Sequence, residues 1–114
     1  MNLLDTDNIL ELLKERRHEI GGISVVTLIE VLRGLEVGKR TKVKELFEES
    51  FNVLNIDNEV IETYCHLYHK LKEKGTSIPD VDLLIAATAM SHNITLKTKD
   101  EHFERLRELG LKLV

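Results

Sequence analysis

Short apolar runs, each about the length of a β-strand, alternate with longer segments of helical periodicity along the whole sequence. The sequence predicts strands at residues 2–4, 51–56, 94–98 and 111–114. It predicts a helix that ends near residue 17, and further helices over residues 25–32, 39–50, 57–75, 79–90 and 101–109. Neighbouring parallel strands need a crossover, which a helix usually supplies. We therefore expect one α/β domain over residues 1–114, with a parallel twisted sheet of about four to five short strands flanked by helices.

The composition excludes several classes of protein. The 114 residues contain one cysteine, Cys65, so the chain has no disulfide framework. No apolar run approaches the ~18 residues of a membrane span, and the first residues lack the basic and apolar regions of a secretory signal. A net charge of −4 argues against a general nucleic-acid coat protein, but not against a nuclease with an acidic site. We expect a cytoplasmic protein without a membrane partner.

Aspartates are concentrated at the junctions between the predicted elements. Asp57 is expected to be the N-cap of a helix, and the other five aspartates lie between apolar runs: Asp5, Asp7, Asp80, Asp82 and Asp100. Aspartate favours caps and turns, and an acid near a helix N-terminus also suits the helix dipole. One interpretation is therefore five caps or turns, and the other is a shared acidic site.

Two of these aspartates are expected at one edge of the sheet. Asp5 follows the first predicted strand and Asp100 follows the third, and ligands bind outside the carboxyl ends of parallel strands. Glu30 and Asp82 lie in predicted helices, and they join the cluster if those helices return to the same edge. Close carboxylates repel each other unless a cation binds, and such oxygen ligands select Mg²⁺ or Mn²⁺. These ions activate water and stabilise the charge of phosphoryl transfer.

Four segments of the chain resemble the four acidic motifs of PIN domains. They read LLDTD at residues 3–7, ISVVTLIE at 23–30, IPDVDLLIAA at 78–87 and TKDEHF at 98–103. Their order and spacing are similar to those of the VapC type, the toxin half of prokaryotic toxin–antitoxin pairs, and the resemblance spans essentially the whole chain. It implies a Mg²⁺- or Mn²⁺-dependent endoribonuclease that hydrolyses phosphodiester bonds of RNA, forms a homodimer and is inhibited by a cognate antitoxin protein.

The resemblance also implies roles for individual residues. The acids that match the catalytic, metal-binding positions are Asp5, Glu30, Asp82 and Asp100. Thr6 matches a hydroxyl residue beside the first acid, and Thr27 lies one turn before Glu30, so both are expected to support the site. Asp7 stands where asparagine is common, and it is either a supporting carboxylate or a cap. Asp80 is not expected to bind the metal.

Basic residues near an acidic site are needed to contact RNA phosphates. The chain has a single basic run, which contains Lys39, Arg40 and Lys42. Lys99, with Lys97 on the other side of Thr98, is the alternative. Most such basic runs are ordinary solvated surfaces, and contact with phosphates at the rim of the site is the alternative interpretation.

Several rival interpretations stay open. The Asp5-Thr6-Asp7 triplet also resembles the D-x-D motif of haloacid dehalogenase-type phosphatases, but the chain is short for that fold and Glu30 is then left without a role. A PIN-like module that binds RNA or protein without cutting it is a second alternative. A PIN nuclease that processes RNA outside any toxin–antitoxin pair is a third.

A zinc site is the last alternative. His66 and His69 have a spacing that zinc sites use and lie next to Cys65, but no second Cys/His pair completes a ligand set. Packing or surface roles are therefore favoured, with Cys65 as a small core residue. Because no thiolate or imidazole set accompanies the acids, zinc is not expected to replace Mg²⁺ or Mn²⁺.

Overall fold

A computed structural model describes residues 1–114 and contains a four-stranded parallel sheet. The strands are β1 (Asn2–Leu4), β2 (Gly22–Ser24), β3 (Asn52–Leu54) and β4 (Thr95–Lys97), in the spatial order β3-β2-β1-β4. The helices are α1 (Thr6–Glu15), α2 (Val25–Arg33), α3 (Val37–Ser50), α4 (Asn58–Glu73), α5 (Asp80–Ser91) and the 3₁₀ helix η1 (Glu101–Leu109). The parallel α/β prediction is confirmed. None of the helices combines the length and apolar character of a membrane span.

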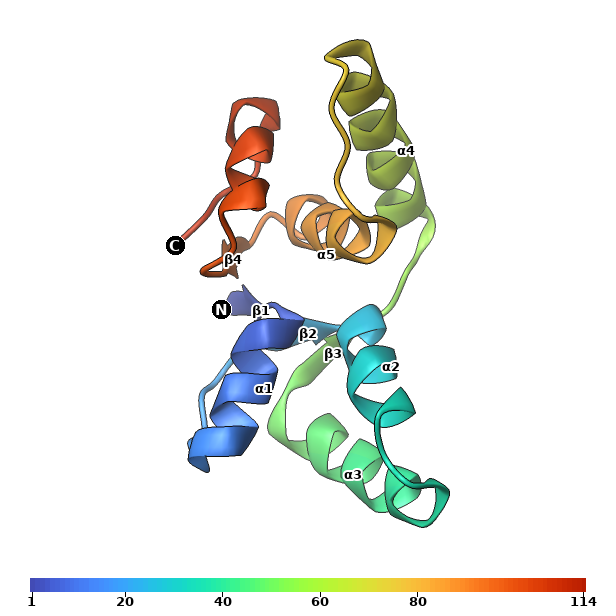
Figure 1. Cartoon of the computed structure of the whole chain (residues 1–114), viewed down its shortest axis with the longest axis vertical. Coiled ribbons are helices and arrows are strands. Elements are labelled where there is room, and N and C mark those ends of the chain that lie inside the picture. Colours follow the sequence, from blue (N-terminus) through green and yellow to red (C-terminus); the bar gives the residue numbers. More distant parts are fainter.

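The sheet lies between two helical layers (Figure 1). Helices α1, α2 and α3 cover one face, and α4, α5 and η1 cover the other. Successive residues of a strand point to opposite faces, so Leu3 is buried against α4 and α5 whereas Leu4 is buried against α1 and α2. Leu96 and Ile23 extend these two cores on β4 and β2. The sheet is therefore buried on both faces, and only its edges are free to carry a site.

Several helices begin directly at the carboxyl end of a strand, where a polar side chain caps them. Asp5 follows β1 and is the N-cap of α1, since its side chain accepts a hydrogen bond from the backbone N–H of Asn8. Ser24 ends β2 and caps α2 in the same way, and Asp100 follows β4 and caps η1. This arrangement brings the first turns of α1, α2 and η1 to one edge of the sheet.

Three details of the predicted fold are wrong. Residues 22–24 form a strand, although only Ile23 is apolar on it, so Asp100 follows the fourth strand rather than the third. The predicted strand at residues 111–114 is reduced to a single bridge between Leu96 and Leu113. Cys65 is exposed on α4, whose buried positions are Val60, Leu67 and Leu71.

Candidate functional site

Asp5 is the most enclosed acid of the molecule, with 4% of its surface exposed at the end of β1. Its Oδ1 accepts hydrogen bonds from the backbone N–H and the side-chain amide of Asn8, at 2.9 and 3.0 Å. Its Oδ2 accepts a hydrogen bond from the Thr98 hydroxyl. The Asn8 amide also donates to the carbonyl oxygen of Lys97 at 2.6 Å. Asp5 is therefore held from α1 and from the end of β4 at the same time.

Glu30 reaches the same region from α2. The Thr6 hydroxyl donates to Glu30 Oε1 at 2.6 Å, and it lies 3.1 Å from the hydroxyl of the buried Thr27. Arg33, one turn further along α2, lies 3.7 Å from Glu30 Oε2. Thr6, which Thr27 contacts in turn, fixes the position of one Glu30 carboxylate oxygen, and the other oxygen faces Arg33.

Asp82 and Asp100 meet around an imidazole. His102 Nε2 lies 2.9 Å from Asp82 Oδ2, and His102 Nδ1 lies 2.8 Å from Asp100 Oδ1. The Nε2 atom is buried and makes no hydrogen bond of acceptable geometry, although the carboxylate is close. Asp82 is in the first turn of α5, whereas Asp100 and His102 lie at the start of η1. The imidazole thus bridges two elements that belong to one helical layer.

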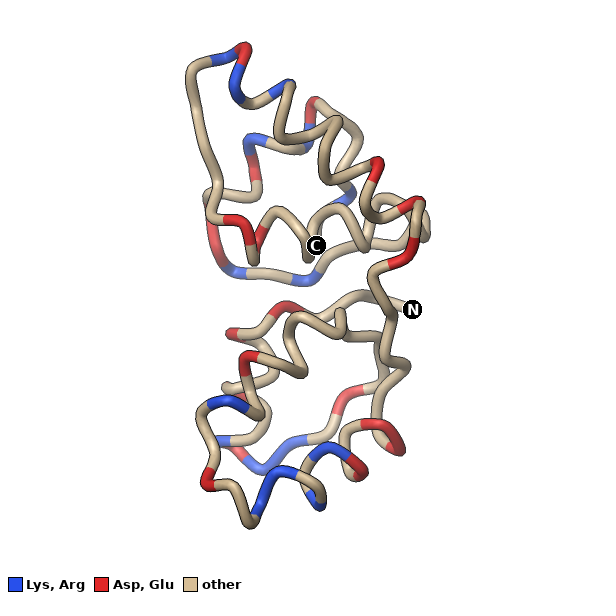
Figure 2. Tube along the Cα trace, turned by 90° about the vertical axis from the view of Figure 1, so that its right-hand side faces the viewer, with Lys and Arg blue, Asp and Glu red and all other residues tan.

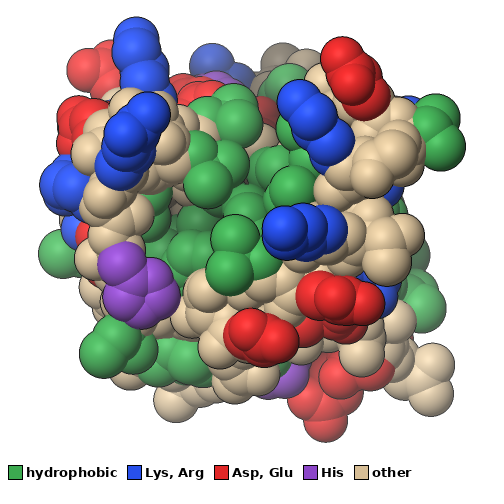
Figure 3. Space-filling view, turned by 90° about the horizontal axis from the view of Figure 1, so that it is seen from below, with side chains coloured by type: hydrophobic (Ala, Val, Ile, Leu, Met, Phe, Trp, Pro, Cys, Tyr) green, Lys and Arg blue, Asp and Glu red, His purple; other side chains and the backbone are tan.

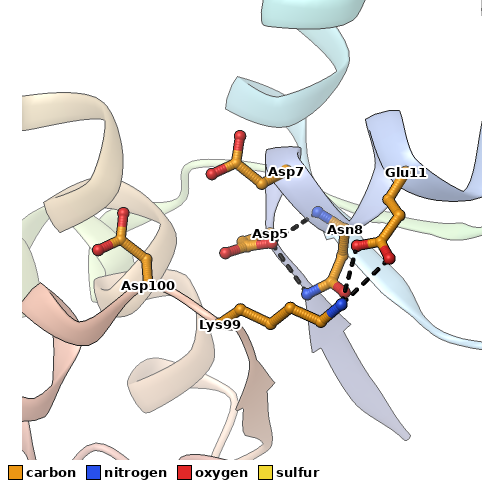
Figure 4. Close-up of a pocket in the computed structure, with 6 residues that line it drawn as sticks. All are labelled: Asp5, Asp7, Asn8, Glu11, Lys99 and Asp100. Carbon is orange, nitrogen blue, oxygen red and sulfur yellow. Dashed lines mark hydrogen bonds and ion pairs between the residues drawn. The ribbon is translucent and has the colours of Figure 1, made fainter.

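The four predicted acids line one cavity. It has a volume of about 330 Å³ and is lined by Asp5, Thr6, Asp7, Leu10, Glu30, Arg33, Asp82, Asp100 and Phe103. A neighbouring depression of about 180 Å³ shares Asp5, Asp7 and Asp100 with it, and also contains Asn8, Glu11 and Lys99 (Figure 4). Lys99 extends past Asp5 to Glu11, 3.1 Å away. In Figure 2, some acidic positions of both helical layers face each other at the left, where the two layers meet, and other acidic positions are spread over the rest of the molecule.

Burial sets the electrostatics of this site. Desolvation raises the pKa of Asp5, and the hydrogen bonds from Thr98 and Asn8 oppose that rise. Desolvation also raises the pKa of Asp82, with the nearby charges of Asp100 and Glu30 acting in the same direction and His102 opposing them. Both carboxylates are therefore harder to ionise than in water. A cation bound between them would favour their ionised forms.

The ligand set fits a divalent metal ion. Asp5, Glu30, Asp82 and Asp100 offer carboxylate oxygens, the donors that Mg²⁺ and Mn²⁺ prefer. Asp82, Asp100 and His102 in addition offer three ligand atoms that lie within 4.8 Å of one another. The structure thus adds one imidazole to the acids, which is not the set of thiolates and imidazoles that a zinc site uses.

The structure places the other predicted residues as follows. Asp7 lines both depressions, and Lys99 lies at the rim of the smaller one. The basic run at Lys39, Arg40 and Lys42 lies on α3 and lines neither depression.

Four residues with contacts in the site were not predicted: Asn8, Arg33, Thr98 and His102. Two of them had a signal in the sequence. Thr98 directly follows β4, and His102 lies within the TKDEHF segment that carries Asp100.

The chain is similar to a protein family and to proteins of known sequence. The PIN domain family model matches residues 2–109. The chain is 43% identical to the ribonuclease VapC1 of Methanocaldococcus jannaschii, over 97% of this chain and 85% of that protein. It is 32% identical to the ribonuclease VapC4 of Mycobacterium tuberculosis, over 77% of this chain and 72% of that protein.

A solved structure shares the arrangement of the elements. The structure of VapBC-1 from nontypeable Haemophilus influenzae superposes with a TM-score of 0.84 at 26% identity, covering 99% of this chain and 96% of the other. The matching family model, the 43% identical relative and the shared fold all span the segments that form the acidic cavity. This chain therefore belongs to the PIN domain family.

Proposed function

We propose that the protein is a metal-dependent endoribonuclease and the toxin of a toxin–antitoxin pair that acts in the cytoplasm. The observation that carries the proposal is the convergence of Asp5, Glu30, Asp82 and Asp100, from four separate elements, on one cavity. Like charges are brought together at a cost in stability, so their convergence favours a cation-binding role over four independent helix caps. The names of the relatives, both called ribonucleases, support the same reaction.

Each residue has a defined task in this proposal. Asp5, Glu30, Asp82 and Asp100 would hold Mg²⁺ or Mn²⁺. A divalent ion bound there supplies a Lewis acid for the hydrolysis of a phosphodiester bond. Thr98 and Asn8 keep the Asp5 carboxylate in one orientation. Thr6 does the same for Glu30, and Thr27 contacts the Thr6 hydroxyl. Asp7 adds negative charge at the mouth of the cavity.

RNA is expected to cross the acids between two basic side chains. Arg33 lines the larger depression and Lys99 the smaller one, with 70% and 78% of their side chains exposed. Both depressions include Asp5, so the two cations flank it from α2 and from the end of β4. Cations at these two places would hold the phosphates on either side of the scissile bond, since phosphate contacts mainly position a strand. The α3 residues Lys39, Arg40 and Lys42 line neither depression, so we assign them a weaker contribution to RNA binding.

An antitoxin segment is expected to lie in an apolar groove between α1 and α3. The groove has a volume of about 150 Å³, with Leu12, Leu13, Leu46 and Phe47 among its lining residues, and Figure 3 shows hydrophobic side chains gathered in a hollow at this end. On α1, Leu13 lines the groove and Leu10, one turn earlier, lines the acidic cavity.

A segment that follows α1 from the groove therefore reaches the acids. An arginine or lysine carried by that segment would pair with Asp5 or Asp82, because a guanidinium fork matches a carboxylate. The structural relative named as a VapBC assembly supports such a partner. A second copy of the chain is a further expected partner, for which the half-exposed Ile61 and Tyr68 on α4 offer an apolar surface.

Cleavage of single-stranded RNA by the purified protein tests the proposal. We expect cleavage with Mg²⁺ or Mn²⁺, none with EDTA, and none from the Asp5→Asn variant. Glu59→Gln is the matched control, because Glu59 is exposed on α4 and lines neither acidic depression. Its activity should equal that of the wild type. Binding of RNA without any metal-dependent cleavage would instead favour the non-catalytic module.

A further inference from the structure

A separate pocket lies between α4, the α4–α5 connection (residues 74–79) and the first turns of α5. Its volume is about 140 Å³. It is lined by Tyr68 and Lys72 from α4, by Thr76 and Ser77 from the connection, and by buried aliphatic side chains that include Leu83 of α5. Pockets for drug-sized ligands typically have ~300–1,000 Å³, so this pocket has room only for a group about the size of one planar ring.

The ring of Tyr68 is half-exposed at this pocket and has a fixed neighbour. It stacks on Tyr64, one turn earlier on α4, with the ring centroids 6.2 Å apart and 26° between the ring planes. The Tyr64 hydroxyl donates a hydrogen bond to Asp80 Oδ1 at 2.6 Å, at the start of α5. This hydrogen bond raises the pKa of Tyr64 to about 12, so the hydroxyl keeps its proton at neutral pH. Tyr68 therefore offers an aromatic surface whose support is anchored to α5.

Two exposed cations lie beside the pocket. Lys72 lines it, and Arg105 of η1 holds the connection from the other side. The Arg105 guanidinium donates to the carbonyl oxygen of Ser77 at 2.9 Å and to the hydroxyl of Thr76 at 3.3 Å. Neither Lys72 nor Arg105 forms an ion pair with a carboxylate. In a chain with a net charge of −4, two such cations beside one pocket favour an anionic ligand.

The pocket is next to the acidic cavity. Asp82 lines the acidic cavity, and Leu83, the next residue of α5, lines this pocket. Figure 1 shows the α4–α5 connection descending beside α4 to the start of α5. In Figure 2 the connection lies at the left of the upper layer, on the side where acidic positions of the two layers face each other. A strand that is bound at the acids can therefore place a neighbouring nucleotide at this pocket.

We propose that the pocket is a nucleotide subsite, in which a base of single-stranded RNA stacks on Tyr68 and the adjoining phosphates contact Lys72 and Arg105. Aromatic rings that stack on unpaired bases, with cations along the backbone, are the usual means by which proteins bind single strands. The subsite rests on the proposed function for the identity of its ligand, but it needs neither a metal ion nor cleavage. A second copy of the chain on this part of α4 is the competing occupant.

Tyrosine fluorescence reports on the subsite directly, because the chain has no tryptophan and its two tyrosines are Tyr64 and Tyr68. The full chain is titrated in EDTA with single-stranded oligoadenylate, and with a ribose-phosphate oligomer of the same length that lacks bases. We expect oligoadenylate to quench the emission, after correction for its absorbance, and the base-free oligomer not to. Tyr68→Leu should bind a labelled oligoadenylate about 5- to 150-fold more weakly, whereas Tyr68→Phe should keep the wild-type affinity.

The phosphate contact is tested by the dependence of oligoadenylate affinity on salt. Lys72→Ala should lower the slope of log affinity against log salt by about 0.7. Lys70→Ala is the matched control, because Lys70 lies on the same helix, pairs with Glu73 at 3.9 Å and does not line the pocket. Its slope should equal that of the wild type.

Three results would overturn the proposal. They are equal quenching by the two oligomers, wild-type affinity in a folded Tyr68→Leu, and a Tyr68→Leu variant in which sedimentation shows a changed oligomeric mass but RNA binding is unchanged. The last result would assign Tyr68 to a second copy. The comparison of the two oligomers uses the wild type, so it decides the matter even if melting shows that Tyr68→Leu does not fold. Quenching by a chain that never cleaves RNA would support the subsite and contradict the nuclease, and cleavage without quenching would do the reverse.

Discussion

Thr98→Val is the substitution that probes the organisation of the acids most sharply. The Thr98 hydroxyl donates to Asp5 Oδ2 and accepts a hydrogen bond from the backbone N–H of Asp100 at 3.0 Å. Valine has a similar shape but makes neither bond, and it leaves a buried carboxylate oxygen without its donor. An unsatisfied buried polar group costs about 1–3 kcal/mol. The Thr98 hydrogen bond is also the strongest influence that lowers the pKa of Asp5, so that pKa should rise further in the variant.

Thermal unfolding in EDTA measures the effect. At about 2.1 cal/mol/K of unfolding entropy per residue, a 114-residue chain melts about 4–12 °C lower for this loss. Thr41→Val, at an exposed position of α3, is the matched control and should change stability by less than about 0.5 kcal/mol. If Thr98→Val melts within about 2 °C of the wild type, the Thr98 hydroxyl does not hold Asp5, and the reasoning about the buried carboxylate is refuted.

Three further predictions concern charge. Asp82→Asn should be more stable than the wild type in EDTA at pH 7, because the raised pKa of Asp82 means that its ionised form destabilises the fold. The variant should not cleave RNA. Glu59→Gln is the control, and a less stable Asp82→Asn would show that Asp82 mainly interacts with the helix dipole. The stabilisation by Mn²⁺ should weaken as the pH falls through the raised pKa values of Asp5 and Asp82, since protons then compete with the metal. Melting curves at several pH values measure this effect. A rise in melting temperature with Mn²⁺ that is the same at every pH would show that these acids do not bind the ion. Arg33→Ala and Lys99→Ala should each lower the slope of log affinity against log salt for single-stranded RNA by about 0.7, measured with an uncleavable RNA, and an unchanged slope would place the RNA elsewhere.

The positions of the acids could be predicted because local chemistry determines them. Asp5 and Asp100 follow segments that the sequence predicts as strands, and a carboxylate at the end of a strand commonly caps the helix that begins there. The short strand β2 could not be predicted, because Ile23 is its only apolar residue and its strand geometry depends on pairing with β1 and β3. The contact of His102 with Asp82 joins residues twenty positions apart, and no local pattern reports it.

The prediction for Cys65 failed for a geometric reason. Helix α4 buries Val60, Leu67 and Leu71, which follow a stripe of helical spacing. Each residue of a helix turns by about 100°, so Cys65 lies well to one side of that stripe and faces solvent. The apolar neighbours of Cys65 in the sequence suggested that it is buried, but its exposure depends on which face of the helix it lies on.

Cleavage of single-stranded RNA during a titration with Mn²⁺, followed alongside the melting temperature, tests the central claim that the acidic cavity binds the metal used for hydrolysis. A ligand at 100 times its Kd adds about 2.7 kcal/mol of stability, which corresponds to a rise of about 11 °C for a chain of this length. We predict that the cleavage rate reaches half its maximum near the Mn²⁺ concentration at which this rise begins, and that Asp5→Asn loses both effects. Cleavage that persists in EDTA, or a melting temperature that does not respond to Mn²⁺ while the RNA is cut, would contradict the claim.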